Sequence, residues 1–199
     1  AGVHFNYSFS DEFWTLYQGI EKDRRQARTF ISDRYMCLIR NILRYGWLIP
    51  YLFGASPAVC KSFLHGKPSI LSTFNENTVY EPNATSLRMG DIGYTNNKES
   101  MAGIKANYDS IDAYIESLRC AIDTPFEEYE KIGVKVDGYY RQLNANILQI
   151  ENEYYSTVRP KVVLLDNEKP TNALEQRGIE YIEIRSIDVK DFDPLGINE

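Results

Sequence analysis

The sequence lacks the features that mark several large classes of protein. Its three cysteines, Cys37, Cys60 and Cys120, are far apart and odd in number, so they form no metal or disulfide pattern and favour a reducing compartment. No signal peptide is recognisable, and the longest apolar run, WLIPYLFGA, is too short to span a membrane. The net charge of −6 argues against general nucleic-acid binding. The sequence therefore predicts a cytoplasmic protein without a membrane or a nucleic acid as partner.

Standard catalytic motifs are also missing. The chain contains no GxxxxGK[ST], GxGxxG, HExxH or GxSxG, so nucleotide binding cannot be inferred from a phosphate-binding loop. What it does have is 199 residues, enough for one domain with a core, and a high aromatic content of 13% with fifteen tyrosines.

The hydrophobic pattern predicts an α+β fold. Alternating residues indicate strands near residues 2–8, 145–153 and 179–187, and a stripe at helical spacing indicates a long helix from about Glu21 to Ile49. We expect the three strands to share one antiparallel or mixed sheet, with this helix on its apolar side. A further helix is expected over residues 108–122.

Local signals add four smaller expectations. Ser10 is a plausible N-cap for a short helix that ends near Ile20. Residues 57–64 predict another short helix, and residues 66–84 read as a loop. Asp137-Gly138 predicts a hairpin turn.

Polar side chains alternate along one face of each predicted strand. One interpretation is ordinary: a hydrogen-bonded histidine, a cross-strand ion pair and solvated carboxylates, because antiparallel sheets often leave one face wet. The other is a polar, open face that holds a hard cation through carboxylate and imidazole ligands. The residues are His4 and Asn6, Glu151 and Glu153, and Glu183 and Arg185.

The segment TSLRMGDIGYTN, residues 85–96, is also unusual. Arg88 is suited to binding a carboxylate through its planar fork, and Tyr94 adds a hydroxyl. The alternative is a structural loop in which Arg88 pairs with Asp91.

Six segments, taken in order, resemble the glutamate–cysteine ligase (γ-glutamylcysteine synthetase) family of the proteobacterial type. They are GVHFNYS, RYGWLIPYLFGASPAVC, ATSLRMGDIGYTN, TPFEEYEKIG, LQIENEYYSTVRPK and GIEYIEIRSID, and they cover essentially the whole chain. Members of that family are much longer. Residues 1–199 therefore resemble the central part of a single catalytic domain, without its amino- and carboxy-terminal parts.

The resemblance implies a glutamine-synthetase-like fold, in which a curved antiparallel sheet has helices on its convex face and the active site on its concave face. It implies ATP-dependent ligation of the γ-carboxylate of L-glutamate to the amino group of L-cysteine through γ-glutamyl phosphate. That reaction is the first step of glutathione biosynthesis. ATP would be a substrate, and Mg²⁺, or alternatively Mn²⁺, the cofactor.

The resemblance also implies roles for individual residues. His4 and Glu183 correspond to metal ligands, and Arg185 to the catalytic, ATP-binding cation on the transferred phosphoryl group. Substrate-binding roles fall to Arg88 and Tyr94 and, in the cysteine pocket, to Tyr155.

Two alternatives to this assignment remain. The chain could be the ligase module of a fused bifunctional glutathione synthetase, or a non-catalytic fragment that only binds an amino acid. The family's other acidic metal ligands lie upstream of Ala1, so the isolated chain is predicted to be inactive. The sequence does not specify an oligomeric state.

Overall fold

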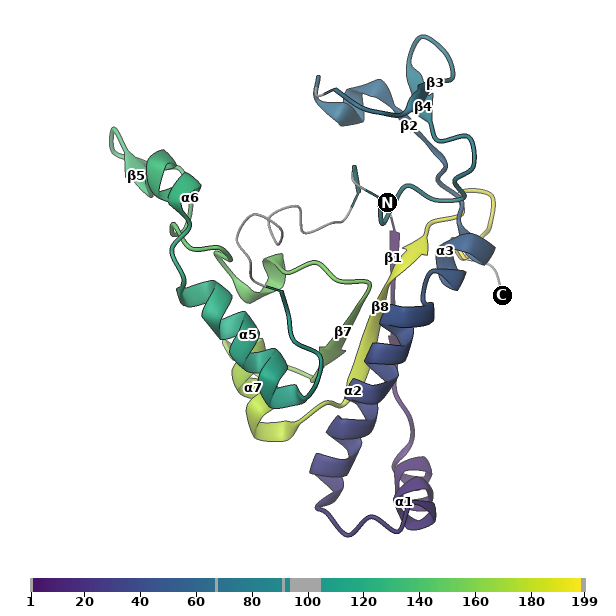
Figure 1. The fold of residues 1–199 in the computed structure, drawn as a ribbon, viewed down its shortest axis with the longest axis vertical. Helices are drawn as coiled ribbons and strands as arrows, with labels where there is room; N and C mark the ends of the chain where they lie inside the picture. The colour runs from purple at the N-terminus through teal and green to yellow at the C-terminus, as the bar shows by residue number, and fades with distance from the viewer. Residues whose placement is uncertain (1, 67, 91, 94–104, 198–199) are drawn as a thin grey trace.

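A three-stranded antiparallel sheet forms the centre of the molecule. The structure, a computed structural model, describes residues 2–66, 68–90, 92–93 and 105–197. The sheet has the order β1-β8-β7, with β1 at Gly2–Tyr7, β8 at Tyr181–Asp188 and β7 at Val158–Lys161. The first and last strands along the chain therefore pair with each other, and β8 lies in the middle (Figure 1).

The register of the central strand decides which side chains share a face. Glu183 lies opposite Asn6 on β1 and opposite Arg159 on β7. Side chains alternate along a strand, so these three residues point to one face, and their neighbours Ile182 and Ile184 point to the other. Ile182 is buried in the hydrophobic core. One face of the sheet is therefore apolar and the other polar, as the alternation predicts.

A β-bulge interrupts the β1–β8 pairing. Val3 lies opposite Ile187 and Phe5 opposite Ile184, so His4 alone faces two residues, Arg185 and Ser186. Bulges re-aim side chains and increase strand twist. Beyond this bulge Asp188 lies opposite Gly2, and because of the extra residue it points to the same polar face as Glu183.

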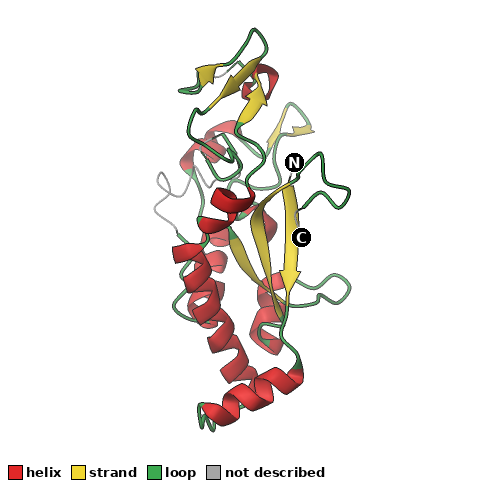
Figure 2. Ribbon diagram, turned by 90° about the vertical axis from the view of Figure 1, so that its right-hand side faces the viewer, coloured by secondary structure: helices red, strands yellow, loops and turns green. Residues whose placement is uncertain are grey.

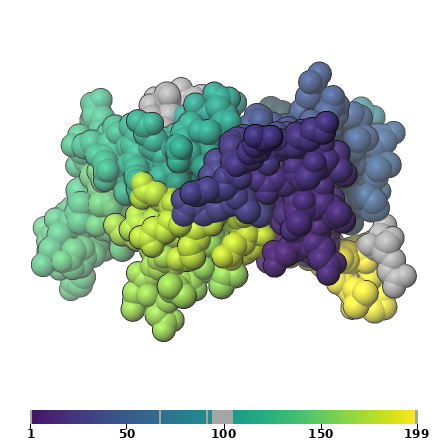
Figure 3. All heavy atoms as spheres, turned by 90° about the horizontal axis from the view of Figure 1, so that it is seen from below, coloured from purple at the N-terminus to yellow at the C-terminus, as the bar shows by residue number. Residues whose placement is uncertain are grey.

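Helix α2 runs along the apolar face of the sheet and contacts α1 and α5, and α5 packs against α7 (Figures 1 and 2). Seen from below, α1 and α2 in purple lie beside α7 in yellow-green and α5 in teal (Figure 3). The bounds are α1 Asp11–Ile20, α2 Ala27–Tyr45, α3 Leu48–Phe53, α5 Ile111–Asp123, α6 Glu127–Ile132 and α7 Pro170–Arg177. Ser10 accepts a hydrogen bond from the Phe13 amide, which confirms it as the N-cap of α1.

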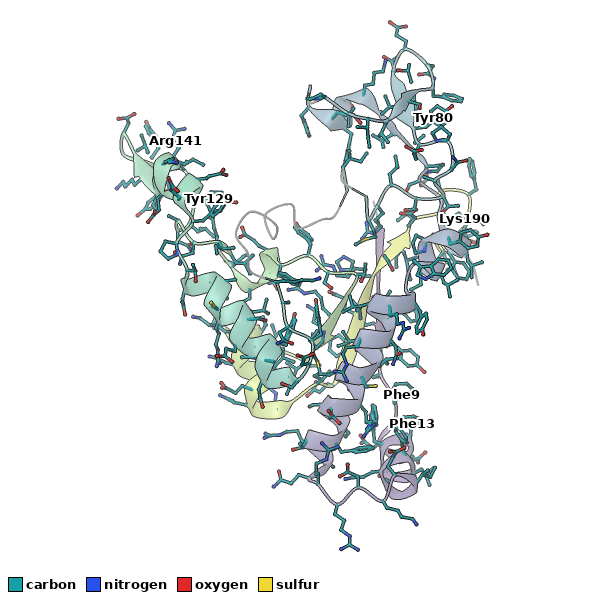
Figure 4. All side chains as sticks on the ribbon, in the orientation of Figure 1. Phe9, Phe13, Tyr80, Tyr129, Arg141 and Lys190 are labelled. Carbon is teal, nitrogen blue, oxygen red and sulfur yellow. The ribbon has the colours of Figure 1, made fainter. Side chains whose placement is uncertain are left out.

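Tyr35 ties the helices to the sheet. Its side chain is fully buried on α2, where its hydroxyl donates to the carbonyl oxygen of Glu180 at 3.1 Å and accepts from the Phe9 amide at 3.2 Å. The ring of Phe9 stacks on Phe13, with 4.4 Å between centroids, and both lie at the start of α1 (Figure 4). One phenol thus joins α2, the β1–α1 connection and the entry to β8.

We expect Tyr35→Phe to lower the free energy of unfolding by about 1–3 kcal/mol, because two partly buried main-chain groups lose their partner. Urea unfolding of the purified chain measures this change. Tyr51→Phe is the matched control, since Tyr51 is 64% exposed and should change little. If Tyr35→Phe is as stable as the wild type, the hydrogen bonds of the Tyr35 hydroxyl do not stabilise the fold.

Two small arms extend from one end of this body. One carries the sheet β2-β4-β3 and the other the two-stranded β5-β6, with Tyr80 and Tyr129 marking them (Figure 4). Positive φ angles at Asp137 and Gly138 confirm the predicted hairpin turn. The bounds are β2 Ala58–Cys60, β3 Ser72–Thr73, β4 Thr78–Tyr80, β5 Lys135–Val136 and β6 Tyr139–Tyr140.

The predicted strand over residues 145–153 is wrong. This segment is irregular and ends in a 3₁₀ helix, η2, at Glu151–Glu153; the third strand of the sheet is β7. Asparagine side chains explain the failure, because they bond to nearby backbone and compete with strand pairing. The Asn144 side chain accepts from the amide of Asn146 at 2.9 Å and donates to the carbonyl of Gln149 at 3.0 Å.

The start of the long helix, the predicted short helix over 57–64 and the predicted loop over 66–84 also differ from the structure. The long helix begins at Ala27, not Glu21, because Asp23 accepts a hydrogen bond from the Arg25 amide in a local turn. Residues 57–64 form β2 and a 3₁₀ helix, η1, at Lys61–Leu64, and residues 66–84 contain β3 and β4. The fold class is α+β with antiparallel sheets, as predicted. Within the described ranges no helix is long and apolar enough to cross a membrane.

Candidate active site

Glu183 is the centre of a charged cluster on the polar face of the sheet. Its Oε1 lies 3.5 Å from Nδ1 of His4, and its Oε2 lies 3.8 Å from both Nη1 of Arg185 and Nζ of Lys161. Glu183 and Arg185 are only 12% and 11% exposed. The expected approach of His4 to Glu183 is thus confirmed, and the structure brings both beside Arg185.

Burial and mutual repulsion set the protonation of this cluster. Desolvation and then the positive charge of Arg185 lower the pKa of His4, despite the nearby Glu183 carboxylate. The imidazole is therefore neutral at pH 7 and can accept a proton or a metal ion. Desolvation, followed by the charge of Arg159, lowers the pKa of Arg185. These shifts point to an excess of positive charge at the site.

Arg88 approaches the same strand from the loop after β4. Only 7% of Arg88 is exposed, and its Nε donates to the carbonyl oxygen of Arg185 at 2.7 Å. The guanidinium lies against Gly2, where an added Cβ would overlap its carbon and nitrogen atoms. Glycine at position 2 therefore gives Arg88 the space to lie flat on the strand.

An aromatic ring borders Arg185. The guanidinium carbon of Arg185 lies 5.5 Å from the ring centroid of Tyr155, which is 36% exposed. This geometry is that of a cation–π contact and limits the directions that Arg185 can take. Tyr155 is the fourth predicted residue that the structure brings to Arg185, after His4, Glu183 and Arg88.

Tyr94 lies outside the described residues, as does Asp91, the alternative partner for Arg88. The two other predicted carboxylates do not belong to the cluster. Glu151 accepts from the amide and hydroxyl of Thr171 at 2.7 and 2.8 Å and so caps α7. Glu153 accepts from the amide of Gln149 at 2.7 Å. Both carboxylates serve the local fold.

Two charged residues of the sheet were not predicted from the sequence. Lys161 contacts Glu183 and so belongs to the cluster. Asp188 is buried at the other end of β8, where it accepts hydrogen bonds from Ala55 and Ser56 and holds the loop before β2. The alternation of Arg159 and Lys161 in VRPK could have indicated Lys161, but only with the register of β7 known.

The donors present fit a magnesium ion only in part. Mg²⁺ requires about six ligands, mostly oxygen, in octahedral geometry. His4 and Glu183 supply one imidazole and one carboxylate, and no group of three or more histidine, cysteine or acidic side chains comes together elsewhere in the described ranges. Any such ion would need further oxygen ligands from phosphate groups or from polypeptide beyond these residues.

A hollow of about 310 Å³ lies where α1 meets α2 and is lined by Trp14, Ile31, Arg28 and Arg177. The two arginines that line this hollow already have protein partners. Arg177 pairs with Glu168 at 2.7 Å, and Arg28 donates to the Gln176 carbonyl. The Glu183 cluster is therefore the better candidate for a reaction site.

Comparison with known proteins gives the cluster a family context. The sequence profile described as Glutamate-cysteine ligase matches residues 1–199. This chain belongs to the glutamate–cysteine ligase family. Among curated glutamate–cysteine ligases it is 52% identical to the one from Alcanivorax borkumensis and 54% identical to the one from Aliivibrio salmonicida. All of this chain aligns, but it spans only 38% of each of these two ligases.

Solved structures agree with this assignment. A glutamate–cysteine ligase from Francisella tularensis, in complex with AMP, matches 99% of this chain with a TM-score of 0.86 and 39% identity, over 38% of its own length. A bifunctional glutathione synthetase from Pasteurella multocida matches 98% of this chain with a TM-score of 0.62 and 26% identity, over 20% of its length. The fold of this segment thus occurs in both kinds of ligase.

Proposed function

We propose that residues 1–199 form the central part of a single glutamate–cysteine ligase catalytic domain. The complete enzyme joins the γ-carboxylate of L-glutamate to the amino group of L-cysteine at the expense of ATP, the first step of glutathione biosynthesis, in the cytoplasm. The observation that carries this proposal is the cluster of His4, Glu183 and Arg185 on one sheet face, in a chain of this family.

The reaction requires two transfers. The γ-carboxylate of glutamate first attacks the terminal phosphorus of ATP, releasing ADP and forming γ-glutamyl phosphate. The cysteine amine then attacks the acyl carbon, and inorganic phosphate leaves. Catalysis of phosphoryl transfer is mostly positioning and charge stabilisation, so no covalent enzyme nucleophile is needed.

Each residue of the cluster has a role in this scheme. Arg185 stabilises the negative charge that spreads over the transferred phosphoryl group, and Tyr155 limits the position of Arg185 while bordering the cysteine pocket. The neutral imidazole of His4 and the carboxylate of Glu183 would hold Mg²⁺ or Mn²⁺. When bound, this ion would neutralise part of the phosphate charge. Arg88, with Tyr94, binds a carboxylate of an amino-acid substrate.

We further propose that the sheet belongs to a curved, glutamine-synthetase-like sheet. Its apolar side, packed on α2, would be the convex face, and its polar side, with Glu183, the concave wall of the substrate funnel. The AMP bound to the Francisella ligase supports a nucleotide site in this fold. ATP and the two amino acids would be the small-molecule partners.

The test is an assay of the complete polypeptide that contains this segment. With ATP, Mg²⁺, glutamate and cysteine it should release phosphate and form γ-glutamylcysteine, and omission of either amino acid should abolish the dipeptide. Formation of glutathione when glycine is added would instead indicate the fused enzyme, which the match to the Pasteurella protein keeps as the second candidate. Amino-acid binding without phosphate release would indicate a non-catalytic fragment.

Gly2 provides a specific check on the role of Arg88. In the complete enzyme Gly2→Ala should displace the guanidinium and raise the KM for glutamate about tenfold, with turnover within about threefold, because the loss affects substrate binding rather than the transition state. Arg88→Ala should act in the same direction.

Gly19→Ala is the matched control for Gly2→Ala, since nothing lies within 4 Å of an added Cβ there. Steady-state kinetics with glutamate varied measures both variants. A fall in turnover with an unchanged KM for glutamate would place Arg88 outside the amino-acid pocket.

A further inference from the structure

Lys161 lies at the end of β7, on the same face of the sheet as the cluster. It is opposite Tyr181 in the register, and its neighbour Arg159 is opposite Glu183. The lysine side chain reaches diagonally across to Glu183, where Nζ lies 3.8 Å from Oε2, and is 27% exposed. A long cation that is mostly withdrawn from water therefore points along the polar face.

Positive charge exceeds negative charge around Lys161. The Glu183 carboxylate is shared by Lys161, Arg185 and His4. Arg159 is 6% exposed, and its Nη2 donates to the main-chain carbonyl of Glu151, a neutral acceptor, at 3.0 Å. Three full positive charges thus lie close together near one carboxylate.

This arrangement costs free energy in the absence of an anion. Lys161 and Arg185 both lie 3.8 Å from Oε2 of Glu183, and Arg159 is opposite Glu183 in the register, so the three cations repel one another at short range. A structural ion pair with Glu183 would not explain the surplus, because one carboxylate cannot balance several cations and a pair at 3.8 Å is weak. A polyanionic ligand would satisfy all of them at once.

We propose that Lys161 binds the terminal phosphates of ATP as a second cation beside Arg185. The assignment rests on the proposed function and adds a residue to its nucleotide site. Lysine is a compact point charge that can follow a phosphate oxygen as it moves, whereas the planar fork of Arg185 holds a fixed direction. Arg185 would thus hold the phosphate chain in a fixed orientation, and Lys161 would follow the phosphate oxygens as they move.

The test uses the complete ligase polypeptide and two nucleotides, a non-hydrolysable ATP analogue with Mg²⁺ and AMP. Lys161→Met should weaken binding of the ATP analogue about 10- to 100-fold, the range expected for a lost charged hydrogen bond, and binding of AMP by less than about threefold. Lys161→Arg should recover part of the loss because it keeps the charge.

Lys131→Met is the matched control, because Lys131 is exposed on α6 and pairs with Glu127 across one helical turn. It should leave both affinities unchanged. Calorimetry or fluorescence titration measures all four proteins, and circular dichroism checks that each is folded.

Three results would overturn the assignment. If the Lys161→Met variant binds the ATP analogue as tightly as the wild type, Lys161 does not bind the phosphates. Equal weakening of AMP and the ATP analogue places it elsewhere on the nucleotide. Altered Mn²⁺ binding without nucleotide, with normal affinity for the analogue, makes it a positioning residue for Glu183. Wild-type protein that binds no ATP analogue refutes the proposed function itself.

Discussion

Arg185→Ala is expected to lower the turnover of the complete ligase by about two to three decades. Charge-stabilising groups of this type contribute about 3–4 kcal/mol to the transition state. Arg185 is suited to this role because it is 11% exposed, borders Tyr155 and shares a strand face with Glu183. Its charge acts most strongly when negative charge spreads over the transferred phosphoryl group, so turnover should fall more than substrate affinity.

Arg185→Lys is the graded comparison. It keeps the charge but loses the planar fork, so its turnover should lie between those of Arg185→Ala and the wild type. Steady-state kinetics with cysteine and ATP varied separately measures both variants. If Arg185→Ala raised only the KM for cysteine and left turnover intact, Arg185 would belong to the amino-acid pocket and the phosphoryl assignment would be wrong.

The second large effect concerns the 199-residue chain by itself. It should fold, yet show a ligase turnover at least about three decades below that of the complete enzyme. Two candidate metal donors, His4 and Glu183, cannot alone hold an ion that contributes several kcal/mol of charge stabilisation.

Phosphate release with glutamate, cysteine and Mg-ATP measures this activity, with the complete polypeptide as the positive control. A cooperative thermal transition of the short chain would show that inactivity is not due to unfolding. Turnover by the short chain near roughly 10 per second, an ordinary enzyme rate, would mean that its own residues complete the site.

Alternation in the sequence was sufficient to predict the faces of β8. Ile182 is buried in the core and Glu183 points to the polar side, because a strand with one apolar and one polar face has only one register that buries the isoleucines. The same alternation predicted β1 and placed His4 on the face that Glu183 shares in the structure.

The errors have a common physical cause: side chains that bond to their own backbone. Asn144 does so just before the segment 145–153, where alternation suggested a strand. Asp23 does so before α2, where an apolar stripe suggested a continuous helix. Lys161 was missed for a different reason, since its place beside Glu183 depends on the pairing of β7 with β8, which no local pattern specifies.

The pairing of β1 with β8 has a consequence for synthesis of the protein. Gly2 faces Asp188, so the strands that carry His4 and Glu183 come from segments separated by nearly the whole chain. Contacts this distant are slow to form, because loop closure precedes any favourable pairing. Until β8 has been synthesised, β1 lacks the strand with which it pairs in this structure. Phe5 and Tyr7 are 40% and 44% exposed even in the folded structure, so β1 without β8 presents apolar side chains and an unpaired strand edge, which favour aggregation.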